Sequence, residues 1–197
     1  NIGIIGCGRV AEHYYKILKL IKKPKISVLA VCDKNTKKAK KFAKQYKSKV
    51  FKNFGNMLNQ NNFDLVVILT PSGLHYKHTK MALGKGFNVL VEKPIALIPK
   101  QASELYKISR KKKLFLGVGF QNRYNKAILF LKKAIRENKF GKIITVSVVL
   151  RWCRFQKYYE DEWHGSWKND GGVISQQAIH HVDVLNTLLG PIKSVSS

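Results

Sequence analysis

Short apolar runs alternate with amphipathic, lysine-rich stretches through the first 119 residues, and this alternation constrains the fold more than any other feature. The run Leu65–Leu69 is apolar throughout, and the helical stretch His75–Lys85 that follows it ends at Gly86, a typical helix C-cap. Strands that are apolar on both faces are typical of a parallel sheet covered by helices on both sides. With right-handed crossovers, the pattern predicts an α/β fold with a doubly wound, Rossmann-type parallel sheet over residues 1–119.

Strands and helices take turns along this part of the chain. We expect strands at residues 2–5, 26–32, 50–51, 65–69, 88–91 and 114–118, separated by helices at 9–22, 36–46, 54–58, 75–85 and 99–112.

The pattern changes after Gly119. We expect a helix at 125–138, a long strand at 142–152, a polar aromatic loop at 154–170, a helix at 175–189 and the start of a strand at 192–195. One helix pair and one long strand cannot complete a sheet. Residues 120–197 are therefore expected to be the N-terminal part of a substrate and oligomerisation domain with an open mixed sheet, incomplete in this chain.

A large excess of lysine gives the chain a formal net charge of +26. Only six of the 37 basic residues are arginine, the side chain that most often reads base edges. The lysines are also spread over most of the predicted helices rather than gathered in one stripe. We therefore expect no nucleic-acid partner, and keep a basic nucleic-acid-associated protein as an alternative. The charge favours anionic small molecules, such as a nucleotide-linked substrate.

Three cysteines, Cys7, Cys32 and Cys153, are far apart and show no CxxC spacing. This pattern argues against a disulfide framework or a metal site and favours a reducing cytoplasm.

No apolar run approaches the ~18 residues that cross a bilayer, and no basic leader precedes the glycine-rich start. We expect a cytoplasmic protein with no membrane contact. The chain begins at Asn1 rather than Met, so we also expect a few residues ahead of it.

A dinucleotide fingerprint follows the first predicted strand. Gly6-x-Gly8-x-x-Ala11 permits a tight turn, close approach of a pyrophosphate and close packing of the following helix. Asp33 ends the second strand, where an acid accepts bonds from the adenosine ribose hydroxyls and favours NAD. Lys34 beside it leaves some room for NADP, and a glycine-rich turn without a ligand is the alternative.

Two further motifs follow later strands, at the sheet edge where open α/β sheets bind ligands. Thr70 to His75 comes after the fourth strand; Thr70 is a candidate for the cofactor ribose or phosphate, while His75 either shares that role or only starts the next helix. Glu92-Lys93-Pro94 ends the fifth strand. Burial and a nearby nicotinamide cation would lower the Lys93 pKa and allow it to orient a substrate hydroxyl or take its proton. Glu92 is expected to hold Lys93 or the nicotinamide ribose, and a solvated Glu–Lys pair is the alternative.

The helix after Gly171-Gly172 carries three polar residues at i, i+4 and i+7: Gln176, His180 and Asp183. This spacing places them on one helical face, while Ile179, Val182, Leu185 and Leu189 are expected to face the core. A histidine with a carboxylate one turn away is a plausible acid or base. A structural histidine is the alternative.

Together these motifs resemble the Gfo/Idh/MocA oxidoreductase family, and the resemblance covers essentially the whole chain. It implies a Rossmann domain followed by an α/β domain with a large open sheet, and homo-oligomers, dimers or tetramers, that associate through that sheet. It also implies hydride transfer between NAD, or less often NADP, and a sugar or polyol carbon, with Lys93 and His180 as the catalytic pair. The residues implied to contact the cofactor are Gly6, Cys7, Gly8, Arg9, Val10, Asp33, Thr70, Pro71, Leu74, His75, Glu92, Lys93 and Gln121.

The second region contains the motifs Gln121-Asn122-Arg123-Tyr124-Asn125, Arg151-Trp152-x-Arg154, Tyr158-Tyr159, Trp163-x-Gly165-Ser166-Trp167 and Asp170-Gly171-Gly172. With these motifs it further resembles the UDP-N-acetylglucosaminuronate 3-dehydrogenases of that family. The implied substrate is a nucleotide sugar oxidised at C3 during surface-polysaccharide synthesis. The residues implied to bind it are Gln176, Asp183, Arg151, Arg154, Tyr158, Tyr159 and Asp170. Gln176 departs from the Asp or Asn of relatives and cannot act as a base, which leaves Lys93 or His180 for that role. Other inositol or UDP-N-acetylglucosamine dehydrogenases and a non-catalytic dinucleotide sensor are the rival functions.

Overall fold

A computed structural model describes residues 1–60, 62–161 and 163–196, and within them six strands form one parallel sheet. Their order is β3-β2-β1-β4-β5-β6, the doubly wound order of a Rossmann fold. The strands are β1 (Ile2–Ile5), β2 (Val28–Cys32), β3 (Lys49–Phe51), β4 (Leu65–Ile68), β5 (Val89–Val91) and β6 (Leu116–Val118). The predicted fold of the first 119 residues is therefore confirmed.

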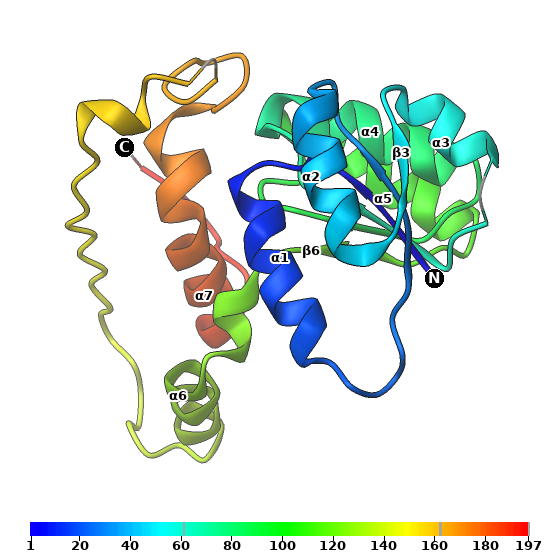
Figure 1. Cartoon of the computed structure of the whole chain (residues 1–197). Helices are drawn as coiled ribbons and strands as arrows, with labels where there is room; N and C mark the ends of the chain where they lie inside the picture. Colours follow the sequence, from blue (N-terminus) through cyan, green and yellow to red (C-terminus); the bar gives the residue numbers. More distant parts are fainter. Residues whose placement is uncertain (61, 162, 197) are drawn as a thin grey trace.

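Helices cover both faces of this sheet (Figure 1). They are α1 (Arg9–Leu20), α2 (Thr36–Tyr46), α3 (Phe54–Gln60), α4 (Ser72–Gly84) and α5 (Pro99–Lys111). Buried residues of α1 and α2 share one apolar cluster with β1, β2 and β4, and buried residues of α3, α4 and α5 share a second cluster with the opposite strand faces. The central strands β1, β2 and β4 are thus buried on both sides, which explains their apolar sequences, whereas the edge strand β3 is largely exposed.

The register of the strands brings their carboxyl ends to one edge of the sheet. Ile5 pairs with Cys32 in β2 and with Ile68 in β4, and Ile68 pairs with Val91 in β5. The residues that follow these strand ends therefore converge on one edge. This edge holds the glycine turn and the carboxylates and lysine of the predicted motifs.

The second region is built mainly from helices. They are the 3-10 turn η1 (Gln121–Tyr124), α6 (Lys126–Arg136), the 3-10 turn η2 (Gln156–Tyr158), the π-helical segment η3 (Ile174–Ala178) and α7 (Ile179–Leu189). The predicted helix at 175–189 is confirmed, except that its first turn is π-helical. In Figure 1, η1 and α6 lie at the lower end of α7.

The predicted strand at 142–152 is wrong for the structure described. Residues 142–152 run as an extended segment without a β-ladder, along the outer edge of the molecule in Figure 1, and residues 192–195 form no strand either. Apolar alternation makes a segment suited to a sheet, but a strand also needs a neighbour for its N–H and C=O groups. The described residues supply no such neighbour here.

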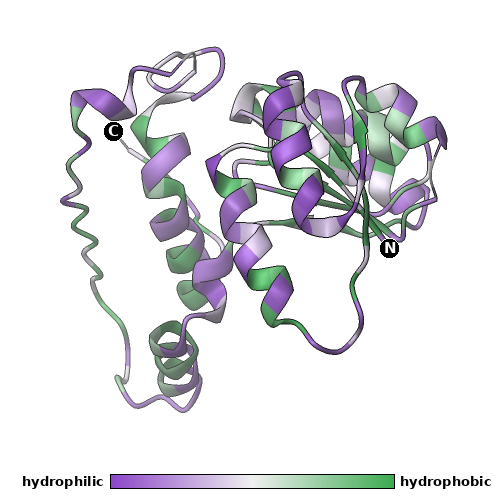
Figure 2. Cartoon of the chain, viewed as in Figure 1, coloured by the Kyte–Doolittle hydropathy of each residue, from purple (hydrophilic) through white to green (hydrophobic). Residues whose placement is uncertain are grey.

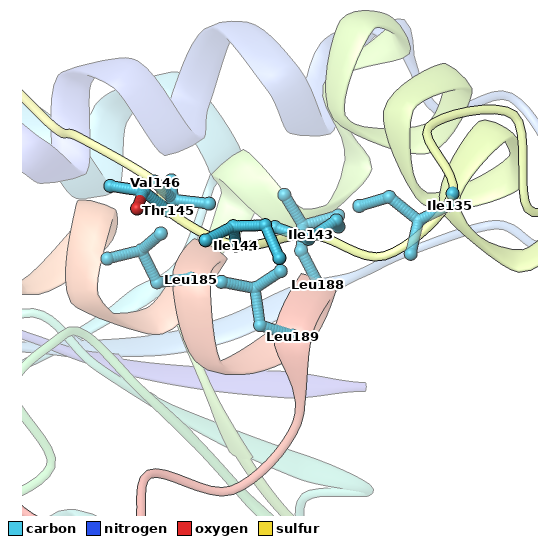
Figure 3. Close-up of a pocket in the computed structure, with 9 residues that line it drawn as sticks. Ile135, Ile143, Ile144, Thr145, Val146, Leu185, Leu188 and Leu189 are labelled. Carbon is cyan, nitrogen blue, oxygen red and sulfur yellow. The ribbon is translucent and has the colours of Figure 1, made fainter.

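The apolar side of α7 is not buried as the sequence predicted, because no residue of α7 is fully buried. Together with the extended segment it borders an aliphatic groove of about 500 Å³ (Figure 3). The groove is lined by Ile135, Gly141, Ile143, Ile144, Thr145, Val146, Leu185, Leu188 and Leu189. In Figure 2, green apolar stretches lie on both the extended segment and α7, interrupted by purple polar ones. Over the described part of the chain, no helix combines the length and apolarity needed to cross a bilayer.

Candidate active site

The turn between β1 and α1 lies at the carboxyl edge of the sheet and contains the Gly-x-Gly motif. Gly6 has φ +94°, a left-handed conformation that side chains disfavour. A Cβ at Gly6 would come within 2.6 Å of the backbone of Leu69, just beyond β4. Glycine therefore allows β1 to turn into α1 this close to the neighbouring strand.

The N-terminus of α1 is open. Gly8 is its N-cap, and no side chain of the described residues accepts a hydrogen bond from this first turn. A Cβ on Gly8 would meet no atom within 4 Å. Free N–H groups and the positive end of a helix dipole beside open space are what an anionic pyrophosphate requires. The residues present therefore fit a dinucleotide at this turn.

Asp33 follows β2 directly and lies beside the glycine turn. Its Oδ2 accepts a hydrogen bond from the Cys7 N–H at 2.7 Å, and its Oδ1 accepts one from the Asn35 N–H at 2.8 Å. These bonds orient the carboxylate and leave lone pairs for ribose hydroxyls. Burial, and then the charge of Asp33, raises the pKa of the Cys7 thiol to about 12. Cys7 is therefore a small neutral residue of the turn rather than a nucleophile at neutral pH.

Arg9, at the start of α1, contacts the aromatic loop of the second region. Its Nη2 lies 3.4 Å from Nε2 of His164, and its guanidinium lies 5.2 Å from the ring centroid of Tyr158. His164 is buried, and its Nδ1 pairs with the carboxylate of Asp161. Because the Asp161 carboxylate accepts a hydrogen bond from Nδ1–H of His164, Nε2 is left as the acceptor for Arg9. Arg9 thus joins the cofactor turn to this loop.

His75 lies on α4 and connects the ends of two strands. It is 1% exposed, its Nδ1 is 2.7 Å from the Pro94 carbonyl oxygen, and its Nε2 is 2.6 Å from the Thr70 carbonyl oxygen. Burial lowers its pKa. With both ring nitrogens on backbone carbonyls, His75 has none left for a cofactor. The His75 side chain therefore joins the ends of β4 and β5, and its contact with the cofactor stays a prediction.

Lys93 follows β5 and reaches the helix of the second region. Its Nζ donates to the Gln176 carbonyl oxygen at 2.6 Å and to Gln176 Oε1 at 3.0 Å. Gln176 is 5% exposed and lies in η3, and π-helical turns are frequent at functional sites. Burial lowers the pKa of Lys93, whereas the charges of Glu92 and Asp170 raise it. The two acceptors orient the amino group and leave its third hydrogen-bonding position for a substrate.

His180 follows Gln176 by one turn and lies close to Lys93. Burial lowers the pKa of His180, and the charges of Lys93 and His181 lower it further. Its Nδ1 is buried without a hydrogen-bond partner among the described residues, and its ring meets Phe120 edge-on at 6.1 Å. A neutral imidazole with a free nitrogen beside Lys93 is suited to handling a proton.

Asp183 binds Arg123 in the structure, not His180. Its carboxylate accepts from Arg123 Nε at 2.7 Å and also from Arg123 Nη2, a two-point pair that ties α7 to η1. The charge of Asp183 still raises the pKa of His180. The spacing of i, i+3 placed Asp183 near His180, but it did not reveal the guanidinium that takes both oxygens.

Arg154 and Tyr158 lie together between the aromatic loop and η3. The Arg154 guanidinium stacks on Trp152 at 3.8 Å from the ring centroid and lies 5.1 Å from that of Tyr158. The Tyr158 hydroxyl accepts from Gln177 Nε2 at 3.0 Å, and Arg154 Nη2 donates to Gln177 Oε1 at 3.4 Å. Arg154 Nε is buried without a partner among the described residues. Hydrogen bonds and stacking therefore hold the cluster in place, and the Arg154 Nε–H is left as a donor for a ligand.

Asp170 is a buried carboxylate with one oxygen unused. It is 6% exposed, its Oδ2 accepts from the Gly165 N–H at 3.0 Å, and its Oδ1 has no partner within the described part of the chain. Its charge is close enough to raise the pKa of Lys93. Buried acceptors normally have partners, so Asp170 Oδ1 is suited to a substrate hydroxyl.

The remaining predicted residues have fewer contacts. Pro71 and Leu74 are half-buried, whereas Val10, Gln121, Arg151 and Tyr159 are exposed. Tyr159 packs edge-on against Tyr158 at 5.1 Å. The contacts predicted for these residues stay predictions.

Four contributors to the site were missed by the sequence reasoning: Tyr14, Asp161, His164 and Gln177. Tyr14 bonds Glu92, His164 and Asp161 hold Arg9, and Gln177 binds Tyr158. Tyr14 lies three residues after the buried Ala11 and hence on the same helical face, which was an available signal. The other three had no local signal.

Comparison with known proteins identifies the family. Residues 1–120 match the model for the NAD-binding Rossmann fold of the Gfo/Idh/MocA oxidoreductases, and residues 132–197 match the C-terminal alpha/beta domain of the same family. The chain belongs to the Gfo/Idh/MocA oxidoreductase family. Both the resemblance and the NAD cofactor predicted from the motifs are thereby confirmed.

Several solved and curated relatives are similar over nearly the whole chain. The WlbA dehydrogenase of Chromobacterium violaceum, solved with NADH and UDP-GlcNAcA, is 35% identical with a TM-score of 0.92, covering 96% of this chain and 55% of that one. The WlbA dehydrogenase of Bordetella pertussis, solved with the same ligands, is 33% identical with a TM-score of 0.92 and covers the same shares. The D-glucoside 3-dehydrogenase of Escherichia coli is 30% identical over 100% of this chain and 56% of its own length. The chain spans about half the length of the curated relatives it matches.

Proposed function

We propose that this protein is an NAD-dependent dehydrogenase that oxidises the C3 hydroxyl of a UDP-N-acetylhexosamine uronate, in a pathway to surface polysaccharide. The observation that carries the proposal is the contact between Lys93 and Gln176, which joins the cofactor edge of the sheet to the helix of His180. The similarity to two dehydrogenases solved with NADH and UDP-GlcNAcA supports the substrate class.

Lys93 is the proposed proton acceptor. Burial lowers its pKa, so a neutral amine is accessible, and Gln176 holds it in one orientation. As the substrate carbinol loses the hydrogen of C3 as hydride, its O–H bond breaks, the proton passes to Lys93 and the carbinol becomes a ketone. NAD, when bound, supplies the hydride acceptor. His180 bonds the same hydroxyl and is the alternative acceptor.

Substrate recognition is assigned to the second region. Arg154 offers an unused Nε–H to a carboxylate or phosphate, and Tyr158 offers a ring to the sugar or base. Asp170 Oδ1 accepts from a sugar hydroxyl. Arg151 and Tyr159, exposed beside this cluster, complete the proposed substrate surface. Asp183, the remaining predicted substrate residue, pairs with Arg123 to hold α7 and raises the pKa of the neighbouring His180.

Cofactor binding is assigned to the edge of the first region. The open N-terminus of α1 takes the pyrophosphate, and Asp33 takes the adenosine ribose, which favours NAD over NADP. Arg9, Val10, Thr70, Pro71, Leu74, Glu92 and Gln121 are the further proposed contacts. We also propose that residues 120–197 are the first part of a substrate domain, and that the protein is a cytoplasmic homo-oligomer.

The test is NADH formation by the purified protein with UDP-N-acetylglucosaminuronate, with UDP-N-acetylglucosamine, glucosides and inositols as competitors. Lys93→Ala should lower turnover roughly 10³-fold because it removes the proton acceptor, while NAD binding stays within about twofold. Lys107→Ala, on the exposed side of α5, is the matched lysine control and should retain full turnover.

The outcomes separate the rival functions. Faster oxidation of a glucoside or an inositol would show that the proposed substrate is wrong, whereas the proposed type of reaction would stand. NAD binding without oxidation of any sugar would favour a non-catalytic dinucleotide sensor. Full turnover by Lys93→Ala would overturn the role of Lys93.

A further inference from the structure

A tyrosine of the cofactor helix reaches the carboxylate beside Lys93. The Tyr14 hydroxyl donates to Glu92 Oε1 at 2.9 Å, linking α1 to the end of β5 across 78 residues of sequence. Burial raises the pKa of Tyr14, and the charge of Glu92 raises it further. Tyr14 therefore keeps its proton throughout the physiological range and remains a donor to this carboxylate.

The Glu92 carboxylate is confined on its other sides. Its Oε2 lies 3.3 Å from the Lys93 backbone N–H, which donates to it. A Cβ on Gly119 would come within 3.0 Å of Glu92 Oε1, so the carboxylate occupies the space that a side chain there would need. Tyr14, the backbone of Lys93 and Gly119 thus enclose one carboxylate position.

The Lys93 side chain is not ion-paired with that carboxylate. Within residues 1–60, 62–161 and 163–196, no carboxylate oxygen lies within 4.0 Å of Lys93 Nζ, which bonds Gln176 instead. The charged or titratable groups that act on Lys93 are Glu92 from β5, Asp170 from the aromatic loop, His75 from α4 and His180 from α7. Of these, Glu92 is the one that Tyr14 holds.

We infer that Tyr14 is a positioning residue: its hydroxyl holds the Glu92 carboxylate toward α1 and thereby leaves the Lys93 side chain to Gln176 and the substrate. Without the hydroxyl, Glu92 loses its only side-chain donor among the described residues, and its carboxylate can turn toward the Lys93 ammonium. A closer and less neutralised carboxylate stabilises the charged form of Lys93 and raises its pKa. The dinucleotide helix and the proton acceptor are coupled through this one hydrogen bond.

This inference depends on the proposed function only for its kinetic meaning, so its main test does not need turnover. The protein is labelled with a trace of acetic anhydride across a pH series, and the acetylated Lys93 peptide is quantified by mass spectrometry. Only the neutral amine reacts, so the midpoint reports the pKa of Lys93. Tyr14→Phe should move that midpoint upward by about one pH unit. Tyr15→Phe, the next residue of the same helix, packs against Tyr46 and should leave it unchanged.

A second variant keeps the test decisive if Tyr14→Phe folds poorly. Glu92→Gln removes the charge and should move the Lys93 midpoint downward. In that background Tyr14→Phe should add no further upward shift, because no carboxylate remains to be released. A Tyr14→Phe midpoint equal to that of Tyr15→Phe, or the same upward shift with Gln at 92, would overturn the inference.

Turnover gives an independent reading. If the sugar is oxidised, the acid limb of the kcat profile of Tyr14→Phe should move with the acetylation midpoint, with KM nearly constant. If no sugar is oxidised, the proposed function fails, while the acetylation series still decides the role of Tyr14.

Discussion

The two regions of this chain differ in how far their apolar side chains are buried. In residues 1–120, the central strands β1, β2 and β4 are buried between two helical layers, and the apolar side chains form two continuous clusters. In residues 121–196, the extended segment exposes Ile144 by 79%, and α7 has no fully buried residue. Similar apolar patterns are thus buried in one region and exposed in the other. Burial needs a second surface to pack against, and among the described residues the first region provides it with its helices.

The candidate site lies across these two regions and depends on both. The cofactor side is built from backbone turns at strand ends, which the sheet holds in place. The substrate side is attached to it by side-chain contacts, chiefly Lys93 with Gln176 and Arg9 with His164, and by a hydrogen bond from the Gly73 N–H to the Asn169 carbonyl. We therefore expect the cofactor side to resist perturbation more than the substrate side.

The largest expected difference between the regions comes from two glycines with positive φ. Gly6→Ala should destabilise the protein by about 4 kcal/mol, because it adds left-handed strain and a Cβ 2.6 Å from the Leu69 backbone. Gly141→Ala should cost only about 1 kcal/mol, since its φ is +60° but no atom lies within 4 Å of the new Cβ. Urea unfolding followed by circular dichroism measures the loss of unfolding free energy in both variants. Equal losses would contradict the expected difference between the two regions.

A smaller difference is expected from removing apolar side chains. Leu83→Ala should cost about 3 kcal/mol, because Leu83 is fully buried between α4 and the sheet and its removal leaves a cavity. Ile144→Ala in the extended segment should cost less than about 0.5 kcal/mol, because the side chain is already in solvent. A large loss at Ile144 in the same urea titration would mean that this segment is covered in solution.

The smallest effect concerns the pH dependence of the first region. The pKa of His78 is lowered to about 4. Burial is the main cause, and the charges of His75, Lys77 and Lys34 lower the pKa further. The unfolded chain therefore binds this proton first, and the stabilisation is complete above about pH 6.5 and lost as the pH falls toward 4. The loss should be about 2 kcal/mol.

His78→Asn should flatten the decline in unfolding free energy between these pH values, measured by urea titrations at each pH. The variant keeps a polar group for the Thr70 hydroxyl, which lies 3.1 Å from His78 Nδ1, but it has no proton to gain. His75 still titrates in both proteins, so some slope remains. Parallel curves would show that His78 is not neutral in the folded protein.

Much of the cofactor side was predictable because its signals are local. Gly6, Gly8 and Asp33 each follow a strand that its apolar run identifies, and parallel strands bring their ends to one edge. The helix of His180 was also predicted, but its π-helical first turn was not. A π turn depends on the contacts made by its backbone, and here Lys93 from β5 takes the Gln176 carbonyl.

The sequence by itself determined the parallel sheet, the dinucleotide turn and the lysine at the end of β5, since period and strand order are properties of neighbouring residues. Only the tertiary structure decided that Lys93 meets Gln176 across 83 residues, that Tyr14 holds Glu92, and that Arg123 takes Asp183. It also decided that residues 142–152 form no β-ladder with the other residues that the structure describes. The physical reason is that hydrogen-bond partners and burial depend on which surfaces come together, and spacing along the chain does not specify that.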